Sequence, residues 1–298
     1  MRISFQTGFR DALADIQRSA RLFADSQREV SSGMRLQAPS DDPLAASAAV
    51  TEHAALGSID RYSRTSSSVT SRLSVADTVL GDIVSQLTAA QTSATGTLGD
   101  TATTAQREAA ARELAGIRDA ILGDLNTNYR GVYLFSGSKS TTASFTQNPD
   151  GTVNAYQGDT STIRVDIDRT SSVQITFDGS AVAQGSDAQD VFAVIEQLRT
   201  DILAGNTPGI QTGIDGLKRA FDRATKMQTE VGTDEKALTD QTARLSDETL
   251  GAKTRLSKLE DADMAEAISS MNRAQAGYQA ALGATATITR VSLLDYLK

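Results

Sequence analysis

The sequence contains neither cysteine nor tryptophan, and it has a single histidine and only 4 prolines in 298 residues. The absence of cysteine excludes disulfides, thiolate metal sites and cysteine nucleophiles. His53 is the only imidazole available to a Ser-His-Asp triad, and it lies in an alanine-rich helical stretch with no nucleophile elbow anywhere in the sequence. We therefore expect a protein that is not an enzyme, with no catalytic residue, no metal ligand and no cofactor.

An excess of basic charge and long apolar runs are also lacking. The formal net charge is -8, which disfavours nucleic-acid binding, because that binding depends on basic patches that neutralise phosphates. No apolar run approaches the roughly 20 residues that span a bilayer, and the first residues lack the apolar core of a cleavable signal peptide. We expect neither nucleic-acid binding nor membrane insertion, and we expect any export to leave the N-terminus uncleaved.

Two short patterns resemble ligand sites without completing them. Ser138 separates Gly137 from Lys139, whereas a phosphate-binding loop needs Gly directly before Lys. Asp41 and Asp42 form a carboxylate pair, but no neighbouring residue completes a set of metal ligands. Because Pro is favoured at the first position of a helix and Asp just before it, this pair predicts a capped helix that begins at Pro43.

Helical periodicity is what the sequence has in abundance. Apolar residues spaced by seven and by four predict an N-terminal helix that ends near Gly33, a long helix through Val69 and Ala94, and further helices toward the C-terminus. Each terminal helix has a narrow apolar seam that needs a partner. The predicted assembly seam contains Phe9, Leu13, Ile16, Ala20, Phe23, Val30, Met271, Tyr278 and Leu282.

The middle of the sequence changes period. A helix is predicted from residue 104 to 129, and then Ile163, Val165 and Ile167 alternate with polar residues as in a strand. The predicted fold is mainly α, a long coiled-coil-like helical rod formed by the N- and C-terminal segments with a small inserted β-rich domain. The predicted parts are an assembly helix and loop (1–42), half of the rod (43–130), the β-rich insert (131–186), the other half of the rod (187–258) and a C-terminal assembly helix (259–298).

Three segments carry a family resemblance. The first is a loop with Gly33, Arg35, Pro39, Ser40, Asp41, Asp42 and Pro43. The second, at residues 128–137, includes Gly131, Tyr133, Leu134, Phe135 and Gly137. The third ends the chain and adds to the predicted seam Leu293, Leu294, Tyr296 and Leu297. Together they resemble the FlgL family, the hook–filament junction proteins of bacterial flagella, which are relatives of flagellin.

The resemblance implies a structural protein that joins hook to filament by coiled-coil co-assembly of its terminal helices. The implied partners are the first hook-associated protein, flagellin, identical subunits in a ring, a cytoplasmic export chaperone and the flagellar type III export apparatus. The implied location is extracellular, on the flagellum.

Two other functions remain open at this stage. A flagellin-type filament subunit would share the helical ends, although flagellin typically lacks prolines at the positions of Pro39 and Pro43. A cell-surface ligand-binding protein would use the β-rich insert, since strand-rich inserts bind many kinds of ligand. Its binding platform would have to come from Tyr133, Phe135, Phe145, Tyr156 and Phe177.

Overall fold

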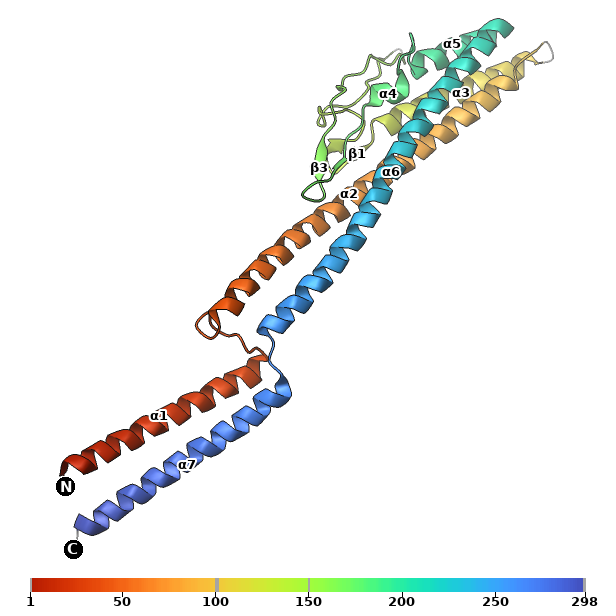
Figure 1. The fold of residues 1–298 in the computed structure, drawn as a ribbon. Helices are drawn as coiled ribbons and strands as arrows, with labels where there is room; N and C mark the ends of the chain where they lie inside the picture. The colour runs from red at the N-terminus through yellow and green to blue at the C-terminus, as the bar shows by residue number, and fades with distance from the viewer. Residues whose placement is uncertain (1, 100–101, 150, 297–298) are drawn as a thin grey trace. The chain divides into compact units, whose positions relative to one another are not determined.

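The computed structural model describes residues 2–99, 102–149 and 151–296, and most of them are helical (Figure 1). The helices are α1 (Arg2–Ser32), α2 (Pro43–Thr95), α3 (Thr104–Leu125), α4 (Gly179–Ala183), α5 (Val191–Ala204), α6 (Thr207–Glu260) and α7 (Met264–Tyr296). The strands are β1 (Asn128–Tyr129), β2 (Val132–Tyr133), β3 (Arg164–Asp166) and β4 (Ser172–Gln174). The predicted fold class, mainly α with a small strand-containing insert, is confirmed.

Contacts divide the chain into two compact units. The terminal unit comprises Met1–Ile59 and Asp247–Lys298, and the central unit comprises Asp60–Ser246. The terminal unit therefore contains α1, α7 and the adjoining ends of α2 and α6. The central unit contains the rest of those two helices, α3, α4, α5 and all four strands.

The core of the central unit is built on the heptad stripe of α2. Leu73, Leu80 and Leu87 are buried there, as the spacing of seven predicts. They belong to one continuous apolar cluster that includes side chains of α3, α5 and α6. Burying a leucine side chain contributes about 1.5–3 kcal/mol, so this stripe is a main source of the stability of the central unit.

The third helix is shorter than its sequence pattern predicts. α3 ends at Leu125, whereas the apolar spacing extends to Asn128, which instead begins β1. The physical reason is Asn126, whose side-chain amide donates to the backbone oxygen of Phe145 at 2.8 Å and accepts from its N–H at 3.0 Å. This pair of hydrogen bonds joins the end of the helix to a distant loop and turns the chain away from the helical path.

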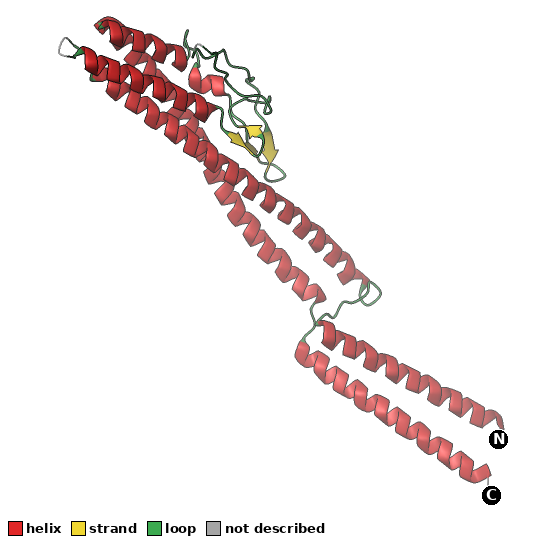
Figure 2. Cartoon of the chain, turned by 180° about the vertical axis from the view of Figure 1, so that it is seen from behind, coloured by secondary structure: helices red, strands yellow, loops and turns green. Residues whose placement is uncertain are grey.

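The insert contains less strand than the alternation predicts. It has two short hairpins, β1–β2 and β3–β4, with Val165 opposite Val173 in the second (yellow in Figure 2). Elsewhere in the described part of the insert, the pairing is limited to isolated bridges such as Gln147 with Val153. Side chains reinforce that bridge, since Asn148 and Asn154 exchange amide hydrogen bonds at 3.0 and 3.1 Å. The short helix α4, capped by Asp178, was not predicted.

In the terminal unit, α1 and α7 lie side by side and run antiparallel (Figures 1 and 2). α1 ends where Gly33 takes a left-handed conformation (φ 70°), which only glycine adopts without strain. α6 ends at Glu260, and α7 is capped by Asp263, which accepts from the N–H of Ala265 at 2.9 Å. The C-terminal helical region therefore consists of two helices, α6 and α7.

Burial in the terminal unit is small. Among its described residues, the side chains that are buried are Ala45, Ala49, Ile59, Ala252 and Ala267. Alanine offers little apolar area, so the unit gains far less from the hydrophobic effect than the leucine-rich central unit. No helix among the described residues has the length and apolar character needed to span a membrane.

Candidate assembly surface

The predicted seam lies partly between α1 and α7. Its half-buried members among the described side chains are Ile16, Ala20, Phe23, Val30, Met271 and Tyr278. Phe23 stacks on Tyr278, with ring centroids 6.4 Å apart and ring planes 6° apart. An aromatic pair of this kind contributes about 0.5–1.5 kcal/mol beyond its buried area. The two ends of the chain thus partner one another, but none of these seam residues is fully buried.

Other apolar side chains of the terminal unit stay largely exposed in the single chain. Leu13 and Leu282, both predicted as seam residues, are 45% and 43% exposed. Further exposed members are Leu22, Met34, Leu44, Val50, Leu250, Met264 and Ile268. Isolated exposed leucines are ordinary, but this many on one thin unit indicate a surface that can be covered by another molecule.

Some predicted seam residues cannot be assigned contacts. Phe9 lies in α1, and Leu293, Leu294 and Tyr296 lie in α7, but their side chains are outside the described set. Leu297 lies outside the described residues altogether. Their part in assembly stays a prediction.

The loop between α1 and α2 is tied to the break between α6 and α7. The N–H of Arg35 donates to the backbone oxygen of Glu260 at 2.7 Å, and the N–H of Ala262 donates to the oxygen of Gly33 at 2.9 Å. The guanidinium of Arg35 donates to the backbone oxygen of Leu259 at 2.8 Å. These contacts explain why the loop has Gly33 and Arg35 where it does.

The remaining loop residues shape its turn and begin the next helix. A carboxylate oxygen of Asp41 accepts from the N–H groups of Gln37 and Ala38, at 3.1 and 2.8 Å, which lowers the pKa of Asp41. Asp42 accepts from the N–H of Ala45 at 3.0 Å and so caps α2, as predicted. Exposed between and beside them are Pro39, Ser40 and Pro43.

Two side-chain pairs join the start of α2 to the end of α6. Arg255 donates both Nε and Nη2 to the carboxylate of Glu52, at 2.7 and 2.9 Å, and this lowers the pKa of Glu52. His53 Nε2 lies 2.9 Å from a carboxylate oxygen of Glu260. With the Arg35 contacts, these pairs form what we call the junction clasp (Arg35, Glu52, His53, Arg255, Glu260). The sequence did not predict it, because no local pattern relates residues about 200 positions apart.

The segment at residues 131–137, which carries part of the family resemblance, serves the fold of the central unit. Gly131 completes the β1–β2 turn with φ 87°, and Leu134 and Phe135 are fully buried. Tyr133 is half-buried in β2. Gly137 has φ 65°, and a Cβ atom there would overlap the backbone oxygen of Asp159, so this position requires glycine.

The aromatic residues of the insert form a core and leave no exposed platform among the described residues. Phe145 is buried and contacts the rings of Tyr156 and Phe192 at centroid distances of 5.3 and 5.1 Å. Phe135 and Phe177 contact each other at 6.0 Å and are also buried. This packing disfavours a ligand site that depends on stacked aromatic rings.

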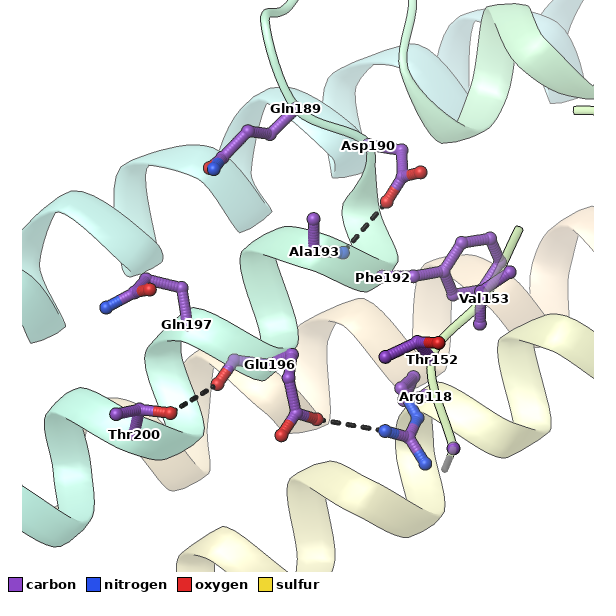
Figure 3. A pocket seen from close by; sticks show the side chains of 11 residues that line it. Arg118, Thr152, Val153, Gln189, Asp190, Phe192, Ala193, Glu196, Gln197 and Thr200 are labelled. Atoms are coloured by element: carbon purple, nitrogen blue, oxygen red, sulfur yellow. Dashed lines mark hydrogen bonds and ion pairs between the residues drawn. The ribbon is translucent and has the colours of Figure 1, made fainter. Parts of the chain in front are cut away.

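A cavity of about 330 Å³ lies between α3, α5 and the loop at Thr152 in the central unit (Figure 3). Arg118 points into it and donates to Glu196 and to Asp119, both at 2.9 Å. Asp190 is engaged as the cap of α5. The charges of this cavity are therefore already compensated. Among the described residues, no group of three or more His, Cys, Asp or Glu is arranged to hold a metal ion.

Comparison with known proteins identifies the class of this helical arrangement. The chain matches the family model for the bacterial flagellin N-terminal helical region over residues 3–140 and the model for the C-terminal helical region over residues 214–297. It is therefore a flagellin-type protein, and the two regions contain the paired helices α1 and α7.

The curated relatives narrow the class. The chain is 28% identical over 309 residues to flagellar hook-associated protein 3 of Salmonella typhimurium, covering 94% of each chain. It is 27% identical over 325 residues to the protein of the same name from Escherichia coli, covering 100% of both. The chain belongs to the FlgL family of flagellar hook-associated proteins and is a component of the flagellum.

Solved structures agree on the fold. A putative flagellar hook-associated protein from Vibrio parahaemolyticus has a TM-score of 0.68 at 19% identity, covering 74% of this chain and 100% of its own. The flagellar junction protein FlgL from Legionella pneumophila has a TM-score of 0.61 at 13% identity, covering 72% of this chain and 100% of its own.

Proposed function

We propose that this protein is a structural subunit of the bacterial flagellum that joins the hook to the flagellin filament, and that it acts by co-assembly of its terminal helices. The observation that carries the proposal is that few side chains of the terminal unit are buried. α1 and α7 share a half-buried seam and leave large apolar side chains exposed. The names of the curated relatives support the same role.

The balance between backbone entropy and apolar burial favours terminal helices that become ordered only when subunits assemble. Holding a residue in a helix costs about 1–2 kcal/mol of backbone entropy. The half-buried seam, together with the buried Ala267 of α7, offsets little of that cost. Neighbouring subunits would bury Leu13, Leu22 and Leu282 as well. Each such side chain contributes about 1.5–3 kcal/mol when buried, so assembly supplies what a single chain lacks.

The partners in this proposal are identical subunits in a ring, the first hook-associated protein on one side and flagellin on the other. The subunit reaches that position by export through the flagellar type III apparatus, after binding a cytoplasmic chaperone. Its final location is outside the cell, on the flagellum. It performs no catalysis, and its single histidine contacts Glu260 within the junction clasp.

Complementation of a strain that lacks the gene tests the proposal. The wild-type chain should restore filaments on hooks, whereas Ile16→Asp combined with Phe23→Asp should leave bare hooks and release flagellin into the medium. Both substitutions force a carboxylate into the seam, which carries a desolvation penalty. Wild-type chains that fail to restore filaments would remove the proposed function.

The matched control is Gln17→Asp combined with Ala24→Asp. These positions have the same spacing on the same helix but are exposed, and they add the same two carboxylates. Filaments should attach normally in this control. Equal loss of filaments in both double variants would show that the seam has no special part in assembly.

A flagellin-type filament subunit is the second candidate, favoured by the matches to the flagellin models. Because the chain has no cysteine, Thr170→Cys creates a single thiol in the exposed turn between β3 and β4. Maleimide dye on intact flagella should mark one spot at the hook end. Label along the whole filament would instead support the filament subunit.

A further inference from the structure

We infer that a pocket formed by α2 and the two hairpins binds a carboxylate side chain of a second copy of this chain, through Arg72 and Arg130. This contact rests on the proposed function, in which identical subunits stand side by side. It lies in the central unit and is separate from the terminal seam.

The pocket has a volume of about 260 Å³ and mixes cationic and apolar walls. Arg72 contributes from α2, Tyr129 and Arg130 from the β1–β2 hairpin, and Val132 and Val165 from β2 and β3. The two hairpins lie beside α2 (Figure 1). Two arginines thus line a space whose other walls are largely apolar.

Arg72 is half-buried, and part of its guanidinium lacks hydrogen-bond partners. Its Nε and Nη2 are buried and have no hydrogen-bond partner, and no carboxylate of the described residues lies within ion-pair distance of it. Burial lowers the pKa of Arg72, and the nearby Tyr129 only partly opposes that effect. Leaving two guanidinium nitrogens of this half-buried residue without a partner costs part of their hydration, so Arg72 is a group whose partner is absent from the single chain.

Arg130 is held in a conformation that disfavours its residue type. It has φ 52°, and with Gly131 at φ 87° it forms a two-residue turn of the kind that favours Asn, Asp or Gly. Its guanidinium carbon lies 5.4 Å from the centroid of the Tyr129 ring. An arginine in this turn costs backbone strain and places a second cation at the pocket, with no carboxylate partner among the described residues.

The chemistry of the pocket selects a carboxylate on a protein side chain. The planar fork of an arginine matches the two oxygens of a carboxylate, and the valine walls limit water, which strengthens the pair. The chain itself offers 37 acidic against 29 basic residues, so the surface of a second copy is a source of complementary charge. In a ring, each copy would both donate a carboxylate and receive one.

The stability of the purified monomer is the first test. Arg72→Met keeps an unbranched side-chain stem and removes the unpaired charge, so the melting temperature of the variant should rise by about 2 °C or more. Arg130→Gly should also be neutral or stabilising, because glycine adopts φ 52° without strain. A clear fall in melting temperature for Arg72→Met would show that Arg72 stabilises the single chain, and it would overturn the inference.

Assembly of the same variants is the second test. In the strain lacking the gene, Arg72→Met should reduce the number of hooks with filaments about tenfold or more, although the monomer is more stable. Arg72→Lys keeps the charge but not the planar guanidinium, so its number of hooks with filaments should lie between those of the wild type and Arg72→Met. If the wild-type chain restores filaments and Arg72→Met does so equally, this inference fails alone. If the wild-type chain also fails, the proposed function fails with it.

Cross-linking identifies the occupant. Ser68 lines the pocket and is exposed, so Ser68→Cys carrying a benzophenone maleimide should cross-link one copy to another in isolated flagella. Ser67→Cys, exposed on the same helix but outside the pocket, is the control and should give little product. A product with another flagellar protein, or none, would overturn the assignment to a second copy.

A free anion is the remaining rival. Inorganic phosphate at constant ionic strength should leave the melting temperature of the wild-type protein unchanged relative to chloride. A rise that is absent in Arg72→Met, together with normal filaments in that variant, would show a small-anion site and overturn the inference.

Discussion

At the scale of single residues, Asp124 shows how the fold disfavours a charge. It lies near the end of α3, and burial, with a smaller effect of Asp82, raises its pKa from 3.8 to about 6. The folded protein therefore retains a proton that the unfolded chain releases. Stability from this residue is fully present at low pH and is lost as the pH rises from 3.8 through about 6.

We predict that Asp124→Asn stabilises the protein at pH 7.5 by about 1 kcal/mol, after allowance for solvent screening of this half-exposed group. Urea unfolding at pH 4 and pH 7.5 measures the effect, which should nearly vanish at pH 4. Asp82→Asn should give a smaller gain, because it removes only the weaker cause. A gain for Asp124→Asn that is the same at both pH values would contradict the explanation.

At the scale of elements, α1 and α7 are the least supported helices of the described chain. Ala267 is the only fully buried residue among their described side chains. Isolated helices with so little packing are marginal in water, and the Phe23–Tyr278 pair is the principal ring contact between them. The two helices should therefore open more readily than the leucine-rich central unit.

We predict that mild proteolysis of the monomer removes roughly 40 residues from each end and leaves a resistant middle. Phe23→Ala with Tyr278→Ala should speed this trimming about tenfold by removing the stacked pair. The melting transition of the central unit should not move, which serves as the internal control. Slow hydrogen exchange of α1 amides in the dilute monomer would contradict the prediction.

At the scale of the whole molecule, the insert shares its core with the helices of the central unit. Leu134, Phe135, Phe145 and Phe177 belong to the same apolar cluster as Leu73 of α2. The domain boundaries predicted at residues 131 and 186 stay predictions. They coincide with a change in sequence pattern, but the same apolar core continues across them. A substitution in the core of the insert should therefore also destabilise the helices of the central unit.

We predict that Phe145→Ala lowers the unfolding free energy of the central unit by about 3 kcal/mol, and that the helical circular dichroism is lost at a correspondingly lower urea concentration. Phe192→Ala and the double variant complete a cycle, in which the ring contact should give a coupling of about 0.5–1.5 kcal/mol. Helices that unfold at an unchanged urea concentration would show that the insert is an independent module.

Local patterns in the sequence determined most of the helices and several of their ends. The heptad stripe of Leu73, Leu80 and Leu87 is buried as predicted, because side chains seven apart lie on one face of a helix. Gly33 ends α1 and Asp42 caps α2, because both effects depend only on neighbouring backbone groups. The resemblance to the FlgL family likewise rested on short motifs of neighbouring residues.

The tertiary structure alone decided features that join distant residues. α3 stops at Leu125 because Asn126 bonds to Phe145, and the junction clasp pairs Glu52 with Arg255. The exposure of Leu13 depends on which side of α1 meets α7, and periodicity does not specify the direction of that contact. The unpaired guanidinium of Arg72 became visible for the same reason. Whether a charged group has hydrogen-bond partners depends on its neighbours in space, and sequence spacing does not predict neighbours that are distant along the chain.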